Sequence, residues 1–299
     1  MPDTRKMISE AIAVAKLAGL DGIAPVELSL GGNLIVHLAP HPIVARIAVV
    51  RSRDEAEDAL ASLAQELRIA RHLHDRNVPV LLPSDRMEAS LYALGDTWMS
   101  CWNYVPPTAL PPLSPEDAAA RIDQLSHAMR GYRGELPHLG VWERTVRSAE
   151  RLTGSADPRV QALLTRFADV DRQMRRETEL FPCHGDAHAG NLLPSPEGWI
   201  WADFEDASLM PAFWDKASFV CNRALFGGMQ EPVFSYIVSR LNDSGEREAF
   251  AFALTARVLM SVLGNLDFAL AGSGDLPFAM SQLERAEACL AQVSRMNEG

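Results

Sequence analysis

The strongest constraint on the fold of this chain is a cluster of five prolines within ten residues: Pro106, Pro107, Pro111, Pro112 and Pro115. Proline has no backbone N–H group and a fixed φ, so this stretch does not fit the interior of a helix or a sheet. The chain has 299 residues, enough for one large domain or for two lobes. We therefore predict two lobes, residues 1–104 and residues 105–299.

Before the prolines, short runs rich in Val, Ile and Leu alternate with turn residues. Gly-Gly-Asn and Pro-His-Pro separate the first three runs, a pattern typical of antiparallel strands: Val26–Leu30, Leu34–Ala39 and Ile43–Val50. Further strands are expected at Val78–Leu82, Ser90–Leu94 and Thr97–Tyr104. A first helix ends near Gly19, and apolar residues at three- and four-residue steps predict a long helix from Asp54 to Arg76. The first lobe is thus a small antiparallel sheet with one long helix after the third strand.

After the prolines the pattern is mainly helical. Ser114 before Pro115, followed by two acidic residues, is typical of a helix start. Seven helices are expected, near residues 115–131, 141–152, 157–180, 212–225, 230–241, 246–271 and 279–296. The predicted fold class is therefore α+β, with a small antiparallel sheet in the first lobe and a helical second lobe.

Composition excludes several classes of protein. The formal net charge of -11 argues against a general nucleic-acid binder, which carries a basic face. The start of the chain is amphipathic and contains Glu10, unlike a signal peptide, and we expect no stretch that approaches the roughly 18 apolar residues of a membrane span. The four cysteines are far apart, which favours reduced, buried thiols and a cytoplasmic protein: Cys101, Cys183, Cys221 and Cys289.

One polar segment, residues 181–206, interrupts the helical pattern. Pro194–Gly198 is flanked by two apolar runs and predicts a short hairpin, whose ends would bring Asn191 and Asp203 together. Asp186 precedes Asn191 by five positions. An Asp, an Asn and a second Asp across a hairpin occur in the same order in protein kinases, where the first handles the hydroxyl proton and the others bind Mg²⁺. Mg²⁺ prefers carboxylate and carbonyl oxygens, so these residue types suit phosphoryl transfer.

The segment resembles the aminoglycoside phosphotransferase and choline kinase-like group, whose pattern HGDxHxxN followed by DFE matches residues 184–191 and 203–205. The resemblance implies a two-lobed protein kinase-like fold that uses ATP and Mg²⁺ to phosphorylate a hydroxyl group of a small molecule. It implies Asp186 as the catalytic base, and it implies three metal ligands: Asn191, Asp203 and Glu205. It also implies that His184 braces the loop and that Asp215, in Trp-Asp-Lys-Ala, bonds to the loop backbone. Lys216 departs from the Leu that is usual after this Asp.

In the first lobe, the resemblance requires a basic residue on the third strand that pairs with a Glu on the next helix. Arg46 is the basic residue within that predicted strand, since none of the three lysines lies on a predicted strand, and Glu66 is its expected partner. The turn at Gly31 and Gly32 would cover the phosphates, although it lacks a full GxGxxG pattern. The adenine ring would meet the end of the last strand: Trp102, Asn103 and Tyr104.

The acceptor is a small molecule with a hydroxyl group. Residues 104–299 carry a net charge of -8, so we expect a cationic acceptor such as an aminoglycoside or amino sugar, with antibiotic resistance as one consequence. Choline, another amino alcohol or a macrolide is the alternative, and four candidate pocket residues are Asp267, Asp275, Glu231 and Asn265. Two other classes stay open: a nucleotide-binding regulator without turnover, and a metal-dependent hydrolase that uses His184 and His188. The sequence leaves the oligomeric state unknown.

Overall fold

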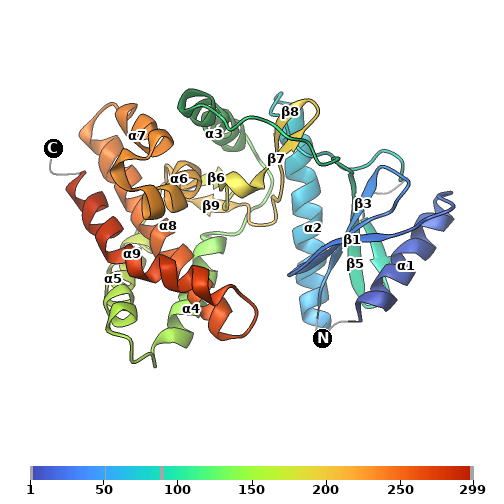
Figure 1. Cartoon of the computed structure of the whole chain (residues 1–299), viewed down its shortest axis with the longest axis horizontal. Helices are drawn as coiled ribbons and strands as arrows, with labels where there is room; N and C mark the ends of the chain where they lie inside the picture. Colours follow the sequence, from blue (N-terminus) through green and yellow to red (C-terminus); the bar gives the residue numbers. More distant parts are fainter. Residues whose placement is uncertain (1–2, 51, 88–90, 297–299) are drawn as a thin grey trace. The chain divides into compact units, whose positions relative to one another are not determined.

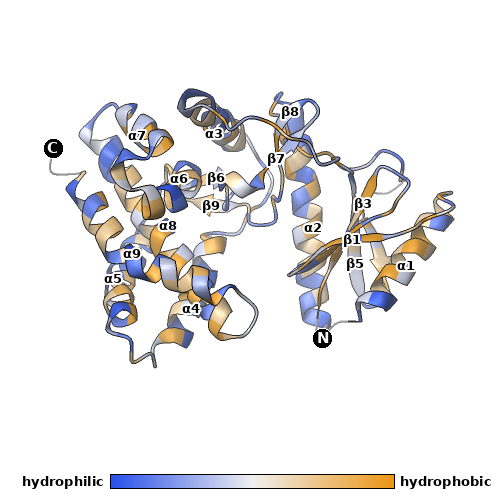
Figure 2. Ribbon diagram, viewed as in Figure 1, coloured by the Kyte–Doolittle hydropathy of each residue, from blue (hydrophilic) through white to orange (hydrophobic). Residues whose placement is uncertain are grey.

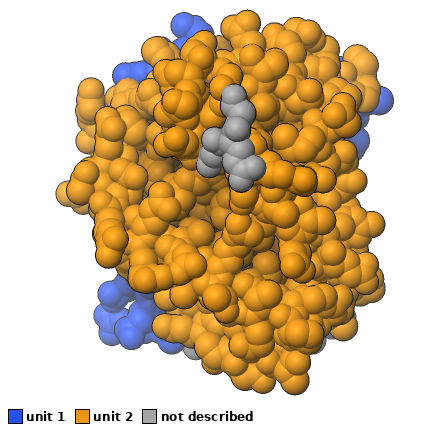
Figure 3. All heavy atoms as spheres, turned by 90° about the vertical axis from the view of Figure 1, so that its left-hand side faces the viewer, with its two compact units in different colours: residues 1–110, 192–205 blue, residues 111–191, 206–299 orange. Residues whose placement is uncertain are grey.

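The computed structural model describes residues 3–50, 52–87 and 91–296. It divides into two compact units, coloured separately in Figure 3: unit 1 comprises residues 1–110 and 192–205, and unit 2 comprises residues 111–191 and 206–299. The predicted division after residue 104 assigned all of 105–299 to the second lobe. In the structure, the segment 192–205 instead belongs to unit 1, because Trp201 exchanges backbone hydrogen bonds with Pro79 and Leu81.

Unit 1 is built on a five-stranded antiparallel sheet with strand order β1-β2-β3-β5-β4. The strands are β1 (Val26–Leu30), β2 (Asn33–His37), β3 (Ile43–Ala48), β4 (Leu91–Leu94) and β5 (Thr97–Asn103). Figure 2 shows hydrophobic colour along β1 and β3, as their Val, Ile and Leu content predicts. Side chains alternate between the two faces of a strand, so Ile43, Ala45 and Ile47 point to one face of β3 and Arg46 to the other.

Two helices lie on opposite sides of this sheet, α1 (Thr4–Leu17) and α2 (Arg53–His74) (Figure 1). Met7, Ala11 and Ala15 of α1 join the apolar core that contains Ile43 and Ile47. Helix α2 starts at Ser52, whose side chain accepts a hydrogen bond from the backbone N–H of Glu55. The face of β3 that carries Arg46 is therefore the face toward α2.

One strand prediction in unit 1 is wrong. Val78–Leu82 forms no strand but a single bridge between Val80 and Trp201, because Pro79 has no N–H group to donate to a ladder. Ser90, the predicted start of β4, lies outside the described residues. The predicted hairpin is present as β7 (Leu192–Ser195) and β8 (Gly198–Trp201).

Unit 2 is mainly helical, so the predicted α+β fold class is confirmed. Its helices are α3 (Pro115–Arg130), α4 (Gly140–Leu152), α5 (Pro158–Met174), α6 (Trp214–Gly227), α7 (Pro232–Ser239), α8 (Ser244–Leu270) and α9 (Leu276–Arg295), with short 3₁₀ turns η1 (Ala189–Asn191) and η2 (Gly228–Gln230). A two-stranded sheet that the sequence did not predict joins β6 (Phe181–Cys183) to β9 (Ser208–Met210). This small sheet anchors both ends of the polar segment, since Cys183 pairs with Ser208.

Helix α8 is the central helix of unit 2 and packs against α4, α5, α6 and α9. By length and composition it could cross a membrane, contrary to the expectation that no stretch approaches such a span. Its most apolar part is mostly buried inside the structure, as in the core helix of a folded domain. All four cysteines are buried and unpaired, which confirms that part of the sequence prediction.

Candidate active site

In unit 1, Arg46 and Glu66 form the pair that the resemblance implies. Arg46 Nη1 lies 3.1 Å from Glu66 Oε1; Glu66 is buried, and the Arg46 side chain is 12% exposed. Strand β3 presents Arg46 toward α2, and Glu66 lies on the face of α2 that is buried with Leu63 and Leu67. The pairing of strand and helix faces thus brings together two residues that are 20 positions apart.

Two further carboxylates converge on the same guanidinium group. Arg46 Nη2 lies 2.9 Å from Asp203 Oδ1 and 2.5 Å from Glu205 Oε2, and the side-chain amide of Asn33 also donates to Glu205 at 2.9 Å. Asp203 has φ = 68°, a left-handed conformation that is uncommon outside glycine and often marks functional segments. Phe204, which lies between Asp203 and Glu205 in the sequence, is buried and donates its backbone N–H to the Glu66 carboxylate.

The charges in this cluster shift the pKa values of its members. Burial raises the pKa of Glu66 to about 7, even though Arg46 acts in the opposite direction. Burial alone would lower the pKa of Arg46, but the three surrounding carboxylates raise it above its ordinary value. The cluster holds one cation and three acidic groups, so it has room for additional positive charge.

The donor set of this cluster fits a divalent metal. Asp203 and Glu205 each direct a carboxylate oxygen to the same nitrogen of Arg46, so both oxygens face one small volume. Hard carboxylate oxygens are the ligands that Mg²⁺ prefers. Asn191, the third predicted ligand, belongs to unit 2. No group of three or more His, Cys, Asp and Glu side chains that could hold a metal is found within residues 3–50, 52–87 and 91–296.

Neither the predicted phosphate-covering turn nor the predicted adenine-contacting strand end of unit 1 shows a feature specific for a nucleotide. A Cβ atom added at Gly31 or Gly32 would meet nothing within 4 Å, so packing does not require glycine in this turn. The backbone N–H groups of Asn103 and Tyr104 already bond to the carbonyls of Leu82 and Pro42, and Trp102 is buried. The adenine contact at this strand end stays a prediction, and these two N–H groups are not available for it.

In unit 2, the loop after β6 is fixed through its backbone. The Asp215 carboxylate accepts hydrogen bonds from the N–H groups of His184 (2.9 Å) and Gly185 (3.1 Å), which is the contact that the resemblance implies. Trp214 Nε1 donates to the Gly185 carbonyl at 2.8 Å. Gly185 has φ = 89°, and a Cβ atom there would lie 1.9 Å from the carbonyl oxygen of Asp206. This position therefore requires glycine.

The Asp186 side chain lies at the surface of this fixed loop. Arg257 Nη2 lies 2.8 Å from Asp186 Oδ1, His188 Nε2 lies 3.5 Å from Oδ2, and the Asn191 side-chain amide donates to the Asp186 carbonyl at 2.8 Å. Burial acts to raise the pKa of Asp186, but Arg257 and the two neighbouring histidines outweigh it and lower the pKa below its ordinary value. Asp186 is therefore ionised at neutral pH, as an acceptor of a hydroxyl proton must be.

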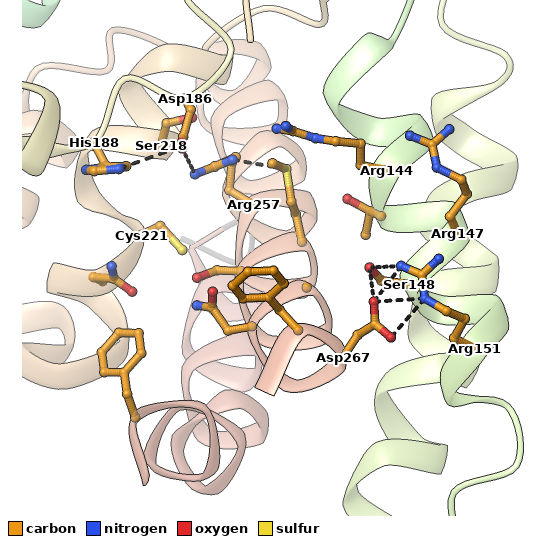
Figure 4. A pocket seen from close by; sticks show the side chains of 18 residues that line it. Arg144, Arg147, Ser148, Arg151, Asp186, His188, Ser218, Cys221, Arg257 and Asp267 are labelled. Atoms are coloured by element: carbon orange, nitrogen blue, oxygen red, sulfur yellow. Dashed lines mark hydrogen bonds and ion pairs between the residues drawn. The ribbon is translucent and has the colours of Figure 1, made fainter. Parts of the chain in front are cut away.

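Beside Asp186, unit 2 contains a cavity of about 690 Å³ (Figure 4). Its walls come from the loop of Asp186 and His188 and from helices α4, α6, α8 and α9. Two of the candidate pocket residues, Asp267 and Asn265, line it. The other two candidates act as helix caps: Glu231 accepts from the N–H of Phe234, and Asp275 accepts from the N–H of Phe278.

The sequence reasoning missed several residues at these sites. Arg257, which bonds to Asp186, is the only charged residue in the sequence between Glu248 and Asp267. A single charged residue in an otherwise apolar helix indicates a buried partner, so this pattern could have identified Arg257 as a site residue. Four arginines line the cavity: Arg144, Arg147, Arg151 and Arg257. The first three are spaced three and four residues apart, which places them on one face of α4.

Comparisons with known proteins agree with this geometry. A model of the phosphotransferase enzyme family matches residues 43–232, more than half of the chain. No curated protein sequence matches. The aminoglycoside phosphotransferase and choline kinase-like resemblance, drawn from the motifs, is confirmed.

Solved structures of kinases share the fold. A choline/ethanolamine kinase family protein from Mesorhizobium loti is 16% identical, with 97% of this chain and 99% of that chain covered and a TM-score of 0.64. Amicoumacin kinase, in complex with AMP-PNP, Ca²⁺ and Ami, is 13% identical, with 99% and 95% covered and a TM-score of 0.66. The GDP complex of an aminoglycoside 2′-phosphotransferase-IIIa variant is 13% identical, with 94% and 97% covered and a TM-score of 0.64. The protein kinase-like fold predicted from the motifs is therefore confirmed.

Proposed function

Because the chain belongs to the phosphotransferase enzyme family and is a small-molecule kinase, we propose that it transfers the γ-phosphoryl group of ATP to a hydroxyl group of a small molecule. The observation that carries this proposal is the Asp186 carboxylate, which Arg257 holds at 2.8 Å at the edge of a cavity of small-molecule size. Family membership favours the kinase over the metal-dependent hydrolase and the regulator without turnover.

Asp186 accepts the proton of the acceptor hydroxyl group as its oxygen attacks the γ-phosphorus. A new O–P bond forms, the bond from the γ-phosphorus to the bridging oxygen breaks, and ADP leaves with that electron pair. Asp215 is a positioning residue, since its two backbone hydrogen bonds hold the loop that carries Asp186. His184 is buried in the same loop and braces it.

The residues of unit 1 handle the nucleotide in this proposal. Arg46, oriented by Glu66, contacts the phosphates, and the turn at Gly31 and Gly32 covers them. Asp203 and Glu205 are the oxygen donors of unit 1 for Mg²⁺, which when bound would supply positive charge that stabilises the phosphates during transfer. Asn191, in unit 2, is a metal ligand only by the resemblance. Two observations support this role. The carboxylates of Asp203 and Glu205 converge in unit 1, and the amicoumacin kinase structure is a complex with AMP-PNP and Ca²⁺.

The acceptor class has two candidates. The first is an aminoglycoside or amino sugar, with antibiotic resistance as an expected consequence, and the aminoglycoside phosphotransferase among the structural neighbours favours it. The second is choline, another amino alcohol or a macrolide, and the choline/ethanolamine kinase neighbour favours an amino alcohol. A cytoplasmic location is part of the proposal and is supported by four buried cysteines that form no disulfide.

The test is replacement of Asp186 by Asn, measured as ADP release with ATP, MgCl₂ and a panel of alcohols that includes kanamycin, choline, glucosamine and glucuronate. We expect kcat on the best acceptor to fall by about 10²–10⁴-fold, because the amide cannot accept the hydroxyl proton. Asp243→Asn, at an exposed helix cap, is the matched control and should leave kcat unchanged. Equal turnover of Asp186→Asn and the unmodified protein would overturn the proposal.

A further inference from the structure

The cavity beside Asp186 is lined by more basic than acidic side chains. Helix α4 presents three arginines to it and α8 presents Arg257, whereas the lining carboxylates among the described residues are those of Asp186 and Asp267. The chain as a whole has a formal net charge of -11. The net charge of the cavity lining is therefore positive, whereas the net charge of the whole chain is negative.

Both lining carboxylates already have a cationic partner. Asp186 is bonded to Arg257, and Asp267 accepts from Arg151 Nε at 2.9 Å and from the Ser148 hydroxyl at 2.9 Å. An ammonium group that entered the cavity would have to displace one of these guanidinium groups. It would also face the positive charges of the remaining arginines, so the lining disfavours a cationic acceptor.

Arg147 differs from the other three arginines of the cavity. Arg144 pairs with Asp206, while Arg151 and Arg257 pair with the two lining carboxylates. Within the described part of the chain, Arg147 makes no ion pair and no hydrogen bond, although it lines the cavity. Its guanidinium fork is a ready partner for a carboxylate or a phosphate, which it can bind through two parallel hydrogen bonds.

A second unpartnered group lies on the same wall. Thr145 is 2% exposed, lines the cavity, and its hydroxyl group has no hydrogen-bond partner within the described residues. A buried hydroxyl without a partner is unfavourable, and an oxygen of a bound ligand would satisfy it. Figure 4 shows Asp186 on one side of the cavity and the α4 arginines on the other.

We propose that the acceptor is an anionic alcohol, whose carboxylate or phosphate group binds to Arg147 while a hydroxyl group of the same molecule faces Asp186 and another of its oxygens accepts from the Thr145 hydroxyl. Three polar residues of the lining are held in place by buried Gln282, which bonds to them at 2.8–2.9 Å: Asn222, Ser261 and Asn265. This inference rests on the proposed function and names the acceptor class of the same site. It replaces the cationic acceptor expected from the net charge of the second lobe.

The experiment compares four hexoses that share one scaffold and differ in charge: glucosamine, glucose, glucuronate and glucose 6-phosphate. Binding to the full chain is measured by isothermal titration calorimetry, and phosphorylation is measured as ADP release with ATP and MgCl₂. We expect glucuronate or glucose 6-phosphate to bind at least tenfold more tightly than glucosamine. The stronger of the two anions identifies the group, carboxylate or phosphate, that the site prefers.

Arg147→Gln should weaken binding of the preferred anion about ten- to a hundredfold and leave glucose binding unchanged, because only the charged contact is lost. Arg147→Lys should restore part of the affinity. Arg133→Gln, at an exposed arginine outside the cavity, is the matched control and should bind the anion like the unmodified protein.

The anionic acceptor and the kinase activity can fail independently. If glucosamine is bound or phosphorylated better than both anions, or if Arg147→Gln binds the anions as well as Arg133→Gln does, the anionic acceptor is wrong. The kinase assignment then still stands provided that Asp186→Asn abolishes turnover of the cationic acceptor. If no hexose is phosphorylated, the calorimetric comparison of the anions and of Arg147→Gln still decides the anion site.

Discussion

The two candidate sites of this protein have opposite charge balances. In unit 1 a single guanidinium group, Arg46, faces three carboxylates. In unit 2 four arginines line a cavity that contains two carboxylates. Residues 104–299 nevertheless carry the larger acid excess, net -8. Net charge therefore does not report the charge of a site, because most acidic residues lie on helix surfaces while a few packed side chains set the charge of a cavity.

The difference in charge balance also shifts the pKa values of Glu66 and Asp186 in opposite directions. Glu66 shares Arg46 with two other carboxylates and is fully buried, and burial raises its pKa to about 7. Asp186 is bonded to Arg257 and has His188 and His184 nearby, and these groups lower its pKa despite burial. An acid that must stay ionised has its own cation, whereas the cluster in unit 1 is short of positive charge.

The largest effect is expected from removal of the cation in unit 1. Arg46→Met would leave Glu66 buried without a counter-charge, and the loss of one partner of a buried pair costs about 3–5 kcal/mol. We expect the free energy of unfolding, measured by urea denaturation, to fall by that amount. Adding Glu66→Gln to the same chain should recover part of the loss, because the unpaired charge is then absent.

Arg53→Met is the matched control, since Arg53 is 92% exposed and pairs with the exposed Glu57. It should change the free energy of unfolding by less than about 0.5 kcal/mol. Equal destabilisation by Arg46→Met and Arg53→Met would show that the cluster in unit 1 does not depend on its single cation.

A smaller effect, on catalysis more than on stability, is expected for the cation that serves Asp186. Arg257 lies over the Trp214 ring and bonds to Asp186, so it fixes the direction of that carboxylate. Arg257→Gln should lower kcat about ten- to a hundredfold and leave the KM for ATP unchanged, because one charge-assisted hydrogen bond is lost. Arg257→Lys should restore part of kcat.

This prediction uses steady-state kinetics together with thermal melting. Arg223→Gln is the control, since Arg223 pairs with the helix cap Glu231 and does not line the cavity. A rise in the KM for ATP with unchanged kcat would contradict the assignment of Arg257 as a positioning residue for Asp186.

The smallest effect is expected for the ion pair at the far wall of the cavity. The hydrogen bond from Arg151 lowers the pKa of Asp267, so the stabilisation is present above the unfolded pKa of about 3.9 and is lost as the pH falls through the folded value. Arg151→Gln should therefore cost about 0.5 kcal/mol or less at pH 7, because Arg151 is 58% exposed and the pair is screened by solvent.

Urea denaturation at a series of pH values checks this prediction. The difference between Arg151→Gln and the unmodified protein should be the same at pH 7 and pH 5 and should shrink below about pH 4. A difference that instead grows as the pH falls from 5 to 4 would show that Asp267 is not the group that Arg151 stabilises.

Most of the fold could be predicted because local patterns determine it. Turn residues delimit the first three strands, and apolar spacing gives the long helices α2 and α8. The small sheet of β6 and β9 was missed because three-residue strands carry no pattern and pair across a gap of more than 20 residues. Val78–Leu82 was assigned wrongly because its apolar residues resemble a strand, whereas Pro79 cannot complete a ladder.

The candidate site was predictable where motifs fix the residue types. Arg46 with Glu66, and Asp215 with the loop backbone, have the contacts that the resemblance implied. The cavity lining was not predictable. The spacing of Arg144, Arg147 and Arg151 shows that they share one face of a helix, but it does not show which part of the protein that face borders. The net charge of residues 104–299 therefore does not predict the charge of the cavity, which is lined by four arginines and two carboxylates.

Phosphoryl transfer to a hydroxyl group that faces Asp186 can be followed in a ³¹P NMR spectrum of ATP, MgCl₂ and the best hexose acceptor, incubated with the protein. Transfer to a hydroxyl group at Asp186 should give one phosphate monoester for each ADP formed, and Asp186→Asn should give almost none. Formation of ADP with only inorganic phosphate, or an undiminished ester signal from Asp186→Asn, would contradict the account.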